Sequence, residues 1–195
     1  MVDTPPALHA HAADNLRFIR DTMSRAGQFT AVPGWGGVAM GVTALATAAL
    51  ASQASDRTLW LVWWLGEAAA AIAIASVTMT RKARRLGLPL LAAPAKRFAL
   101  AYVPPLAAGA VLTAVFVGNG LSARLPGCWL LLYGVAIATA GTLSVRVVQL
   151  MGVVFMALAA ASFAAPAGFG DAFMAAGFGG LHIVFGLIIA RNHGG

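Results

Sequence analysis

Residues 58–85 read TLWLVWWLGEAAAAIAIASVTMTRKARR, a long apolar run that ends in a cluster of cations. The apolar part contains one ionisable side chain, Glu67. As a helix, the apolar part, residues 58–80, spans roughly 34 Å at 1.5 Å per residue, which matches the hydrocarbon core of a bilayer, roughly 30 Å thick. The stretch therefore predicts a transmembrane helix. Trp60, Trp63 and Trp64 lie near its start, where an aromatic belt at the membrane interface is expected.

The rest of the chain repeats this pattern. Of its 195 residues, 60% are hydrophobic and only 10% are charged, and the mean hydropathy is +0.83. A soluble domain carries about 25% charged residues. We predict an all-α, polytopic membrane bundle of six transmembrane helices, with spans at about residues 30–52, 58–80, 98–118, 125–144, 147–166 and 172–190.

The boundary between the fourth and fifth spans depends on length. Between residues 125 and 166 only Arg146 and Gln149 are strongly polar. One continuous helix there would be about 63 Å long, about twice the thickness of the hydrocarbon core. The chain must therefore turn back, and we expect the turn at Arg146.

Residues 1–29 are predicted to form a separate cytoplasmic segment, an amphipathic helix that precedes the bundle. Between residues 7 and 28, apolar side chains recur at steps of three and four, while Arg17, Asp21 and Arg25 repeat on another face. Such a helix lies along the membrane interface, either as an anchor or as a docking site for a soluble partner. We expect the first span, and no cleaved leader, to act as the insertion signal.

The cations predict the orientation. With six spans and a cytoplasmic N-terminus, every Lys and Arg except Arg57 and Arg124 lies in a segment predicted to be cytoplasmic. This asymmetry predicts that both termini face the cytoplasm, in an inner (plasma) membrane. The basic segment between the second and third spans is expected to contact anionic lipid headgroups, at about 1 kcal/mol per cation. Its cations are Arg81, Lys82, Arg84, Arg85, Lys96 and Arg97.

Three polar side chains fall at comparable depths inside the predicted spans: Glu67, Tyr133 and His182. An ionisable group there costs about 2.5–3.5 kcal/mol on insertion scales and often marks a functional site. Counted from the cytoplasmic ends of their spans, Glu67 and Tyr133 are level, and His182 differs from Glu67 by roughly 7 Å. The three can form a site that binds a cation or relays protons. Alternatively, the carboxyl group and the imidazole serve only to hold helices together.

Two further patterns concern helix geometry. The adjacent residues Pro104 and Pro105 remove two backbone donors, so we expect a kink or local unwinding in the third span. Gly37 and Gly41 form a small-xxx-small pair in the first span, which lets another helix approach closely.

Several classes of site are disfavoured. The net charge of +7 does not indicate a nucleic-acid-binding protein, because the aromatic residues lie inside the apolar runs. Cys128 is the only cysteine, and His182 is the only histidine in a predicted span, so neither a bis-histidine haem nor a complete metal site is expected. No cofactor is predicted. No catalytic motif with an identifiable base is present, so an enzyme is not favoured.

The sequence leaves two functions open. The first is a non-catalytic accessory, sensor or assembly protein that packs against a membrane partner or a second copy of itself. The alternative is a transporter or channel for a small solute, an ion or protons, which uses Glu67, Tyr133 and His182.

Overall fold

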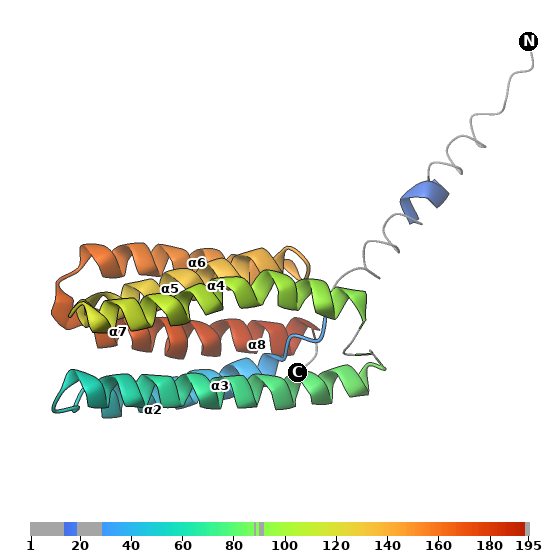
Figure 1. The fold of residues 1–195 in the computed structure, drawn as a ribbon. Helices are drawn as coiled ribbons and strands as arrows, with labels where there is room; N and C mark the ends of the chain where they lie inside the picture. The colour runs from blue at the N-terminus through green and yellow to red at the C-terminus, as the bar shows by residue number, and fades with distance from the viewer. Residues whose placement is uncertain (1–13, 19–28, 88, 90–91, 194–195) are drawn as a thin grey trace, which may run out of the picture.

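Helices account for almost all of the computed structural model, which describes residues 14–18, 29–87, 89 and 92–193. In this part of the chain, six helices are long and apolar enough to cross a membrane (Figure 1). The predicted all-α bundle of six spans is therefore confirmed.

The first five spans are continuous α-helices, and the sixth is divided. The five are α2 (Gly34–Ala51), α3 (Arg57–Arg85), α4 (Ala93–Gly118), α5 (Leu125–Gly141) and α6 (Arg146–Ala164). The sixth consists of α7 (Gly170–Met174), a π-helical segment η3 (Ala175–Leu181) and α8 (His182–His193). Short 3-10 helices, η1 (Ser122–Arg124) and η2 (Ala167–Phe169), precede α5 and α7.

The turn between the fourth and fifth spans occupies residues 142–145, and Arg146 is the first residue of α6. Arg146 therefore follows the turn and is not its apex. Both α3 and α4 extend beyond the predicted spans into the basic segment: α3 ends at Arg85 and α4 begins at Ala93. The end of an apolar run therefore does not mark the end of a helix.

Most of the predicted N-terminal amphipathic helix lies outside the described residues. Residues 14–18 are helical and exposed, and Arg17 lies 3.9 Å from Asp14 on the next turn. The membrane-surface role of this segment stays a prediction.

Two helices that follow one another in the sequence, α3 and α4, do not pack closely together. α5 packs closely against α4 and α6, and α2 packs against α3 and the sixth helix. In the described part of the chain, α3 and α4 are not among the closely packed pairs. Figure 1 shows α4 in one layer with α5 and α6, and α3 in the opposite layer beside α2.

Glycines allow α2 to lie directly against the sixth helix. A Cβ atom on Gly41 would lie 2.6 Å from the carbonyl oxygen of Gly179, and one on Gly37 would lie 3.2 Å from the Cα atom of Gly186. The close approach predicted for Gly37 and Gly41 is confirmed, and the approaching segment is the sixth helix. Backbone contact of this kind gives dispersion attraction that bulkier residues would prevent.

We expect Gly41→Ala to destabilise the fold, because the added methyl group would force α2 away from η3. Overpacking of this kind costs about 1–3 kcal/mol. Gly66→Ala is the matched control: a Cβ atom on Gly66 meets nothing within 4 Å, and alanine is the better helix former. Thermal unfolding in mild detergent measures both. Equal melting temperatures for the two variants would contradict the glycine contact.

Lys82 joins three parts of the chain at one end of the bundle. Its side chain is buried, and its ammonium group donates hydrogen bonds to the carbonyl oxygen of Val32 at 2.9 Å and to that of His193 at 2.8 Å. Lys82 therefore does not face the lipid headgroups as predicted, because it is buried and bonds to backbone carbonyls just before α2 and at the end of α8. The other five cations of the basic segment are exposed.

Lys82→Met is expected to destabilise the bundle by about 1.5–3 kcal/mol, the range for a hydrogen bond made by a charged group. Arg81→Met, at the exposed neighbouring position, is the control and is expected to change stability by less than about 0.5 kcal/mol. Chemical unfolding in detergent compares the two variants. A loss of stability no larger for Lys82→Met than for Arg81→Met would show that the buried ammonium is dispensable.

Helix α4 runs through Pro104 and Pro105 without a break. The local unwinding that the two prolines predicted is not seen. Since Pro105 has no N–H group, the carbonyl oxygen of Ala101 loses its usual helical donor. The hydroxyl group of Thr139 on α5 lies 3.1 Å from this oxygen, and it also lies 2.7 Å from the carbonyl oxygen of Val135. A hydroxyl from a neighbouring helix thus offers the freed carbonyl a partner.

Candidate functional site

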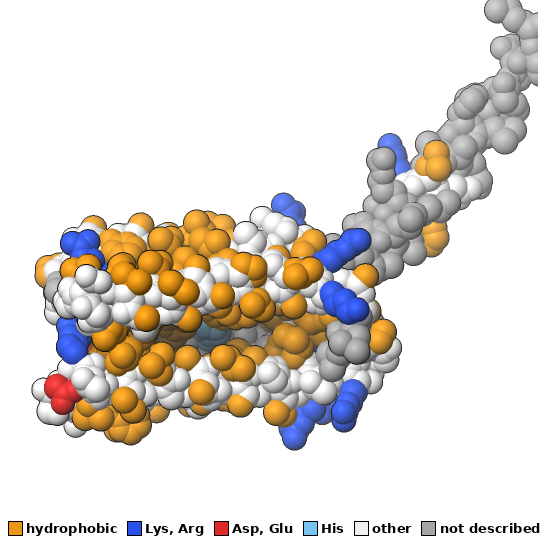
Figure 2. Space-filling model, in the orientation of Figure 1, with side chains coloured by type: hydrophobic (Ala, Val, Ile, Leu, Met, Phe, Trp, Pro, Cys, Tyr) orange, Lys and Arg blue, Asp and Glu red, His pale blue; other side chains and the backbone are white. Residues whose placement is uncertain are grey.

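A pocket of about 490 Å³ lies between the two layers of the bundle, where α3 and α4 do not pack together. Figure 2 shows a hollow on this side of the molecule, rimmed by hydrophobic side chains, with a histidine visible inside it. α3 and α4 supply the two walls, and α2, α5 and the sixth helix supply the floor. The lining includes all three predicted site residues, Glu67, Tyr133 and His182.

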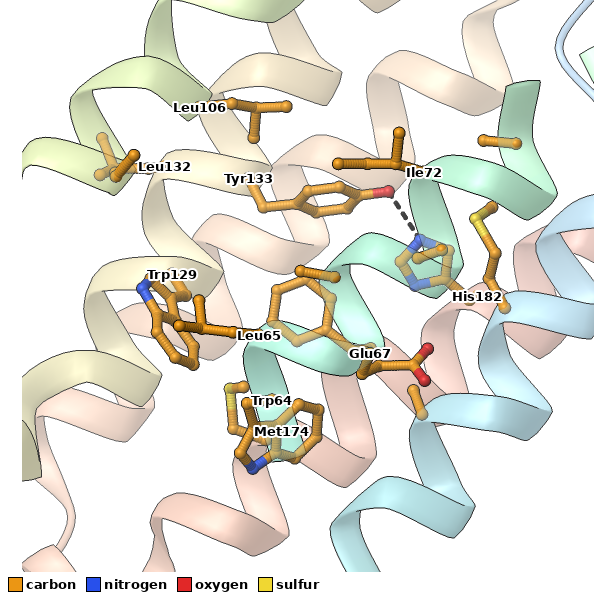
Figure 3. A pocket seen from close by; sticks show the side chains of 18 of the residues that line it. Trp64, Leu65, Glu67, Ile72, Leu106, Trp129, Leu132, Tyr133, Met174 and His182 are labelled. Carbon is orange, nitrogen blue, oxygen red and sulfur yellow. Dashed lines mark hydrogen bonds between the residues drawn. The ribbon is translucent and has the colours of Figure 1, made fainter. Parts of the chain in front are cut away.

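Tyr133 and His182 form a direct hydrogen bond. The Tyr133 hydroxyl lies 2.6 Å from Nε2 of His182, as the dashed line in Figure 3 shows. With Nδ1 protonated, the hydroxyl donates to Nε2; with Nε2 protonated, the hydroxyl accepts. Nδ1 makes no hydrogen bond of good geometry with the described residues, although the backbone carbonyls of Gly177 and Phe178, one turn earlier, interact with the ring.

The π-helical segment η3 ends directly before His182. π-Helical turns are rare and frequently occur at functional sites, because they rotate the following side chain relative to an α-helix. The glycines in η3 are poor helix formers, and they also make room for neighbours: a Cβ atom on Gly177 would clash with a methyl group of Leu130. The sequence before His182 is rich in glycine (Gly177, Gly179 and Gly180), which indicates close helix packing. Glycine content alone does not predict a π-helix.

Glu67 is turned away from the tyrosine–histidine pair. Its two carboxyl oxygens lie 2.8 Å from the Thr43 hydroxyl and 3.2 Å from the Thr47 hydroxyl, both on α2. In Figure 3 the carboxyl group points toward α2 and away from Tyr133. The structure thus brings Tyr133 and His182 into contact and places Glu67 in the same pocket without a direct bond to either. Thr43 and Thr47 were missed, because threonine is common in membrane helices and carries no signal of its own.

Aromatic rings form much of the pocket wall. The ring of Phe178 lies 5.2 Å from that of Tyr133 and 6.4 Å from that of Trp64, and it stacks on His182 at 6.1 Å. Tyr102 on α4 meets Tyr133 edge-on at 6.3 Å. These rings surround the polar groups with flat, apolar surfaces.

The tryptophans correct the expectation of an interfacial belt. Trp60 and Trp64 are each only 3% exposed, whereas Trp63 is 39% exposed. Trp60 stacks on Trp129 at 5.6 Å and donates a hydrogen bond from Nε1 to Asp171 at 2.6 Å. Trp60 and Trp64 therefore pack across helices and do not face lipid, which the position of a residue along one helix does not reveal. For the exposed Trp63, an interfacial position stays a prediction.

Pro104 and Pro105 are not among the residues that line the pocket; α4 contributes Tyr102, Leu106 and Gly109 from the same stretch. Among the described residues, no group of three or more His, Cys, Asp or Glu side chains is placed to hold a metal ion.

No protein-family model matches the chain. No curated protein and no solved structure is significantly similar to it. Any proposal about function therefore rests on the residues of the pocket.

Removal of the tyrosine hydroxyl tests the Tyr133–His182 bond. In Tyr133→Phe, Nε2 of His182 loses its partner in an apolar environment, at a cost of about 1–3 kcal/mol. The ¹⁵N resonances of His182 should shift, which NMR of histidine-labelled protein in detergent measures. Thr113→Val is the control and should leave these resonances nearly unchanged, since the Thr113 hydroxyl lines the same pocket but bonds to Trp129 and not to His182. Unaltered resonances in Tyr133→Phe would refute the bond.

Proposed function

We propose that this multi-pass membrane protein binds a small molecule that reaches the pocket from the lipid phase, and that it acts as a sensor or accessory protein. The position of the pocket carries the proposal. It lies between α3 and α4, whose membrane-spanning stretches are the least buried of the six. A molecule dissolved in the bilayer can therefore enter sideways.

The composition of the wall supports ligand binding. Small-molecule sites commonly measure about 300–1,000 Å³ and combine apolar and aromatic walls with a few placed polar groups. This pocket has such walls, and its polar groups include Glu67, Tyr133 and His182. Tyr133 and His182 place a hydroxyl beside a base, but Nδ1 of His182 has no hydrogen-bond partner among the described residues that would orient the base. We therefore propose binding without covalent chemistry.

Transport is the second candidate, and the buried carboxyl group favours it. A carboxyl group and an imidazole inside a bundle are the kinds of side chain that pass protons or ions across membranes. Proton or cation flux in proteoliposomes distinguishes the candidates. If Glu67→Gln and His182→Ala leave the flux unchanged, transport by this site is excluded.

The distribution of charge supports an orientation with both termini in the cytoplasm of a cell with a plasma (inner) membrane. Arg81, Arg84, Arg85, Lys96 and Arg97 lie at the end of the bundle where α3 stops and α4 begins. Arg57 and Arg124 lie at the opposite end. We propose that the five exposed cations contact anionic headgroups of the cytoplasmic leaflet, and that a partner or a second copy can pack on the lipid-facing helices.

A lipid-soluble phenyl diazirine tests entry from the bilayer. After irradiation in nanodiscs, peptide mapping should find label on Phe178 or Met174, which line the pocket. Ala71→Leu should strongly reduce this internal labelling, because Ala71 lines the pocket and leucine would narrow it. Labelling of exposed residues on α4, such as Val111, should not change.

Ala73→Leu is the matched control, since Ala73 is exposed on the same helix and does not line the pocket. It should label like the wild type. Label confined to exposed positions in the wild-type protein would show that bilayer molecules do not enter, and the proposed function would fail.

A further inference from the structure

Glu67 is a buried carboxyl group without a cationic partner. It is 9% exposed, and the structure gives it no ion pair among the described residues. Its partners are neutral hydroxyl groups, those of Thr43 and Thr47. An ionised carboxylate in an apolar interior is costly unless a positive charge accompanies it. The pocket therefore holds a carboxyl group that can take a negative charge only when a cation lies beside it.

The surroundings of Glu67 suit a particular kind of cation. Trp64 lies three residues earlier on α3, and Phe178 and Tyr133 also line the pocket. The faces of aromatic rings attract cations, most strongly in places without water. A small ion would have to give up its hydration water to enter between these apolar walls, which costs free energy. An organic cation with apolar substituents is weakly hydrated and avoids most of that cost.

We propose that the pocket binds lipophilic organic cations and that Glu67 supplies the counter-charge. This inference rests on the proposed function, since it specifies the class of molecule that enters from the bilayer. A cation whose charge is shielded by apolar groups is soluble enough in the bilayer to use the opening between α3 and α4.

The hydrogen bonds around Glu67 accommodate both charge states. The Thr43 hydroxyl lies 2.8 Å from Oε1 of Glu67 and 2.9 Å from the carbonyl oxygen of Met40. When Glu67 is protonated, its O–H can donate to Thr43, while Thr43 donates to Met40. When Glu67 is ionised, Thr43 turns its proton to the carboxylate. Neither state requires a heavy atom to move.

This arrangement couples cation binding to proton release. In the empty pocket the neutral form avoids an unpaired charge. On binding, the O–H bond of Glu67 breaks, the proton leaves to water and the carboxylate pairs with the cation. The other titratable side chains that line the pocket are Tyr102 on α4, Tyr133 on α5 and His182 on the sixth helix.

Tetraphenylphosphonium and tetraphenylborate test the charge requirement, because they share one shape and carry opposite charges. Equilibrium dialysis against protein in nanodiscs, with protein-free nanodiscs subtracted, measures both. Wild-type protein should bind the cation at least about tenfold more tightly than the anion, which corresponds to about 1.4 kcal/mol. Weakly buffered protein should also release protons when the cation binds, as a pH indicator reports.

Glu67→Gln keeps the size of the side chain and removes the charge. It should weaken cation binding about tenfold or more and abolish the proton release. Asp171→Asn is the matched acid-to-amide control: Asp171 lies outside the pocket lining, and its amide oxygen can still accept from Trp60. It should bind the cation like the wild type.

The outcomes separate this inference from the proposed function. If the wild-type protein binds both probes equally, or if Glu67→Gln binds the cation as before, the cation preference is wrong. In that case, Ala71→Leu still blocks both probes if the pocket is a lipid-phase site. If Ala71→Leu leaves the binding of both probes unchanged, the pocket itself is not the site, and the proposed function fails with it.

Discussion

Helix α2 holds the bundle together through two different faces. One face carries Gly37 and Gly41, which bring its backbone against the sixth helix. Another carries Thr43 and Thr47, whose hydroxyl groups meet the carboxyl group of Glu67. Close backbone contact fixes the position of the sixth helix relative to α2, and hydrogen bonds fix α3 relative to α2. The positions of His182 and Glu67 around the pocket therefore both depend on this one helix.

Polar groups inside a membrane protein need partners, and this bundle supplies most of them. Tyr133 pairs with His182, and the two threonines pair with Glu67. Two buried nitrogens in the pocket wall, Nδ1 of His182 and Nε1 of Trp64, have no hydrogen-bond partner among the described residues. Such unmet capacity costs free energy in an apolar environment. Both nitrogens are themselves shielded, so of these polar groups it is the carboxyl group of Glu67 that we propose meets a ligand.

The six spans could be predicted because the length of an apolar run is directly constrained by bilayer thickness. The common depth of Glu67, Tyr133 and His182 could be predicted for the same reason, since rise per residue converts position into depth. The rotation of each helix about its own axis could not be predicted from the sequence. Lipid and protein interior are both apolar, so no polar face shows which side of a span meets its neighbours. Hence the burial of Trp60 and Trp64 and the turning of Glu67 toward α2 were not foreseen.

The burial of Lys82 and the continuity of α4 through the prolines could not be predicted for a second reason: the partners of the groups involved come from distant segments. The carbonyl groups that bind Lys82 belong to Val32 and His193, and the hydroxyl near the freed carbonyl of α4 belongs to Thr139. Considered alone, a lysine after a hydrophobic span indicates a headgroup contact, and two prolines indicate a break. The hydrogen bonds of Lys82 reverse the first expectation, and α4 stays helical through both prolines with a hydroxyl beside one freed carbonyl. An unsatisfied carbonyl group is costly wherever water is scarce, so such partners matter.

Small residues have opposite effects on the two sides of the bundle. Between α2 and the sixth helix, glycines face glycines, so the backbones touch. On α3, the small residues Ala68, Ala71 and Ala75 face the pocket, opposite Tyr102 and Leu106 of α4. Helix α4 contributes small residues as well, Gly109 and Ala110, so the space between the two helices stays unfilled. Small residues therefore accompany close contact where two backbones meet directly, as α2 and the sixth helix do, and an open space where the two helices stay apart, as α3 and α4 do.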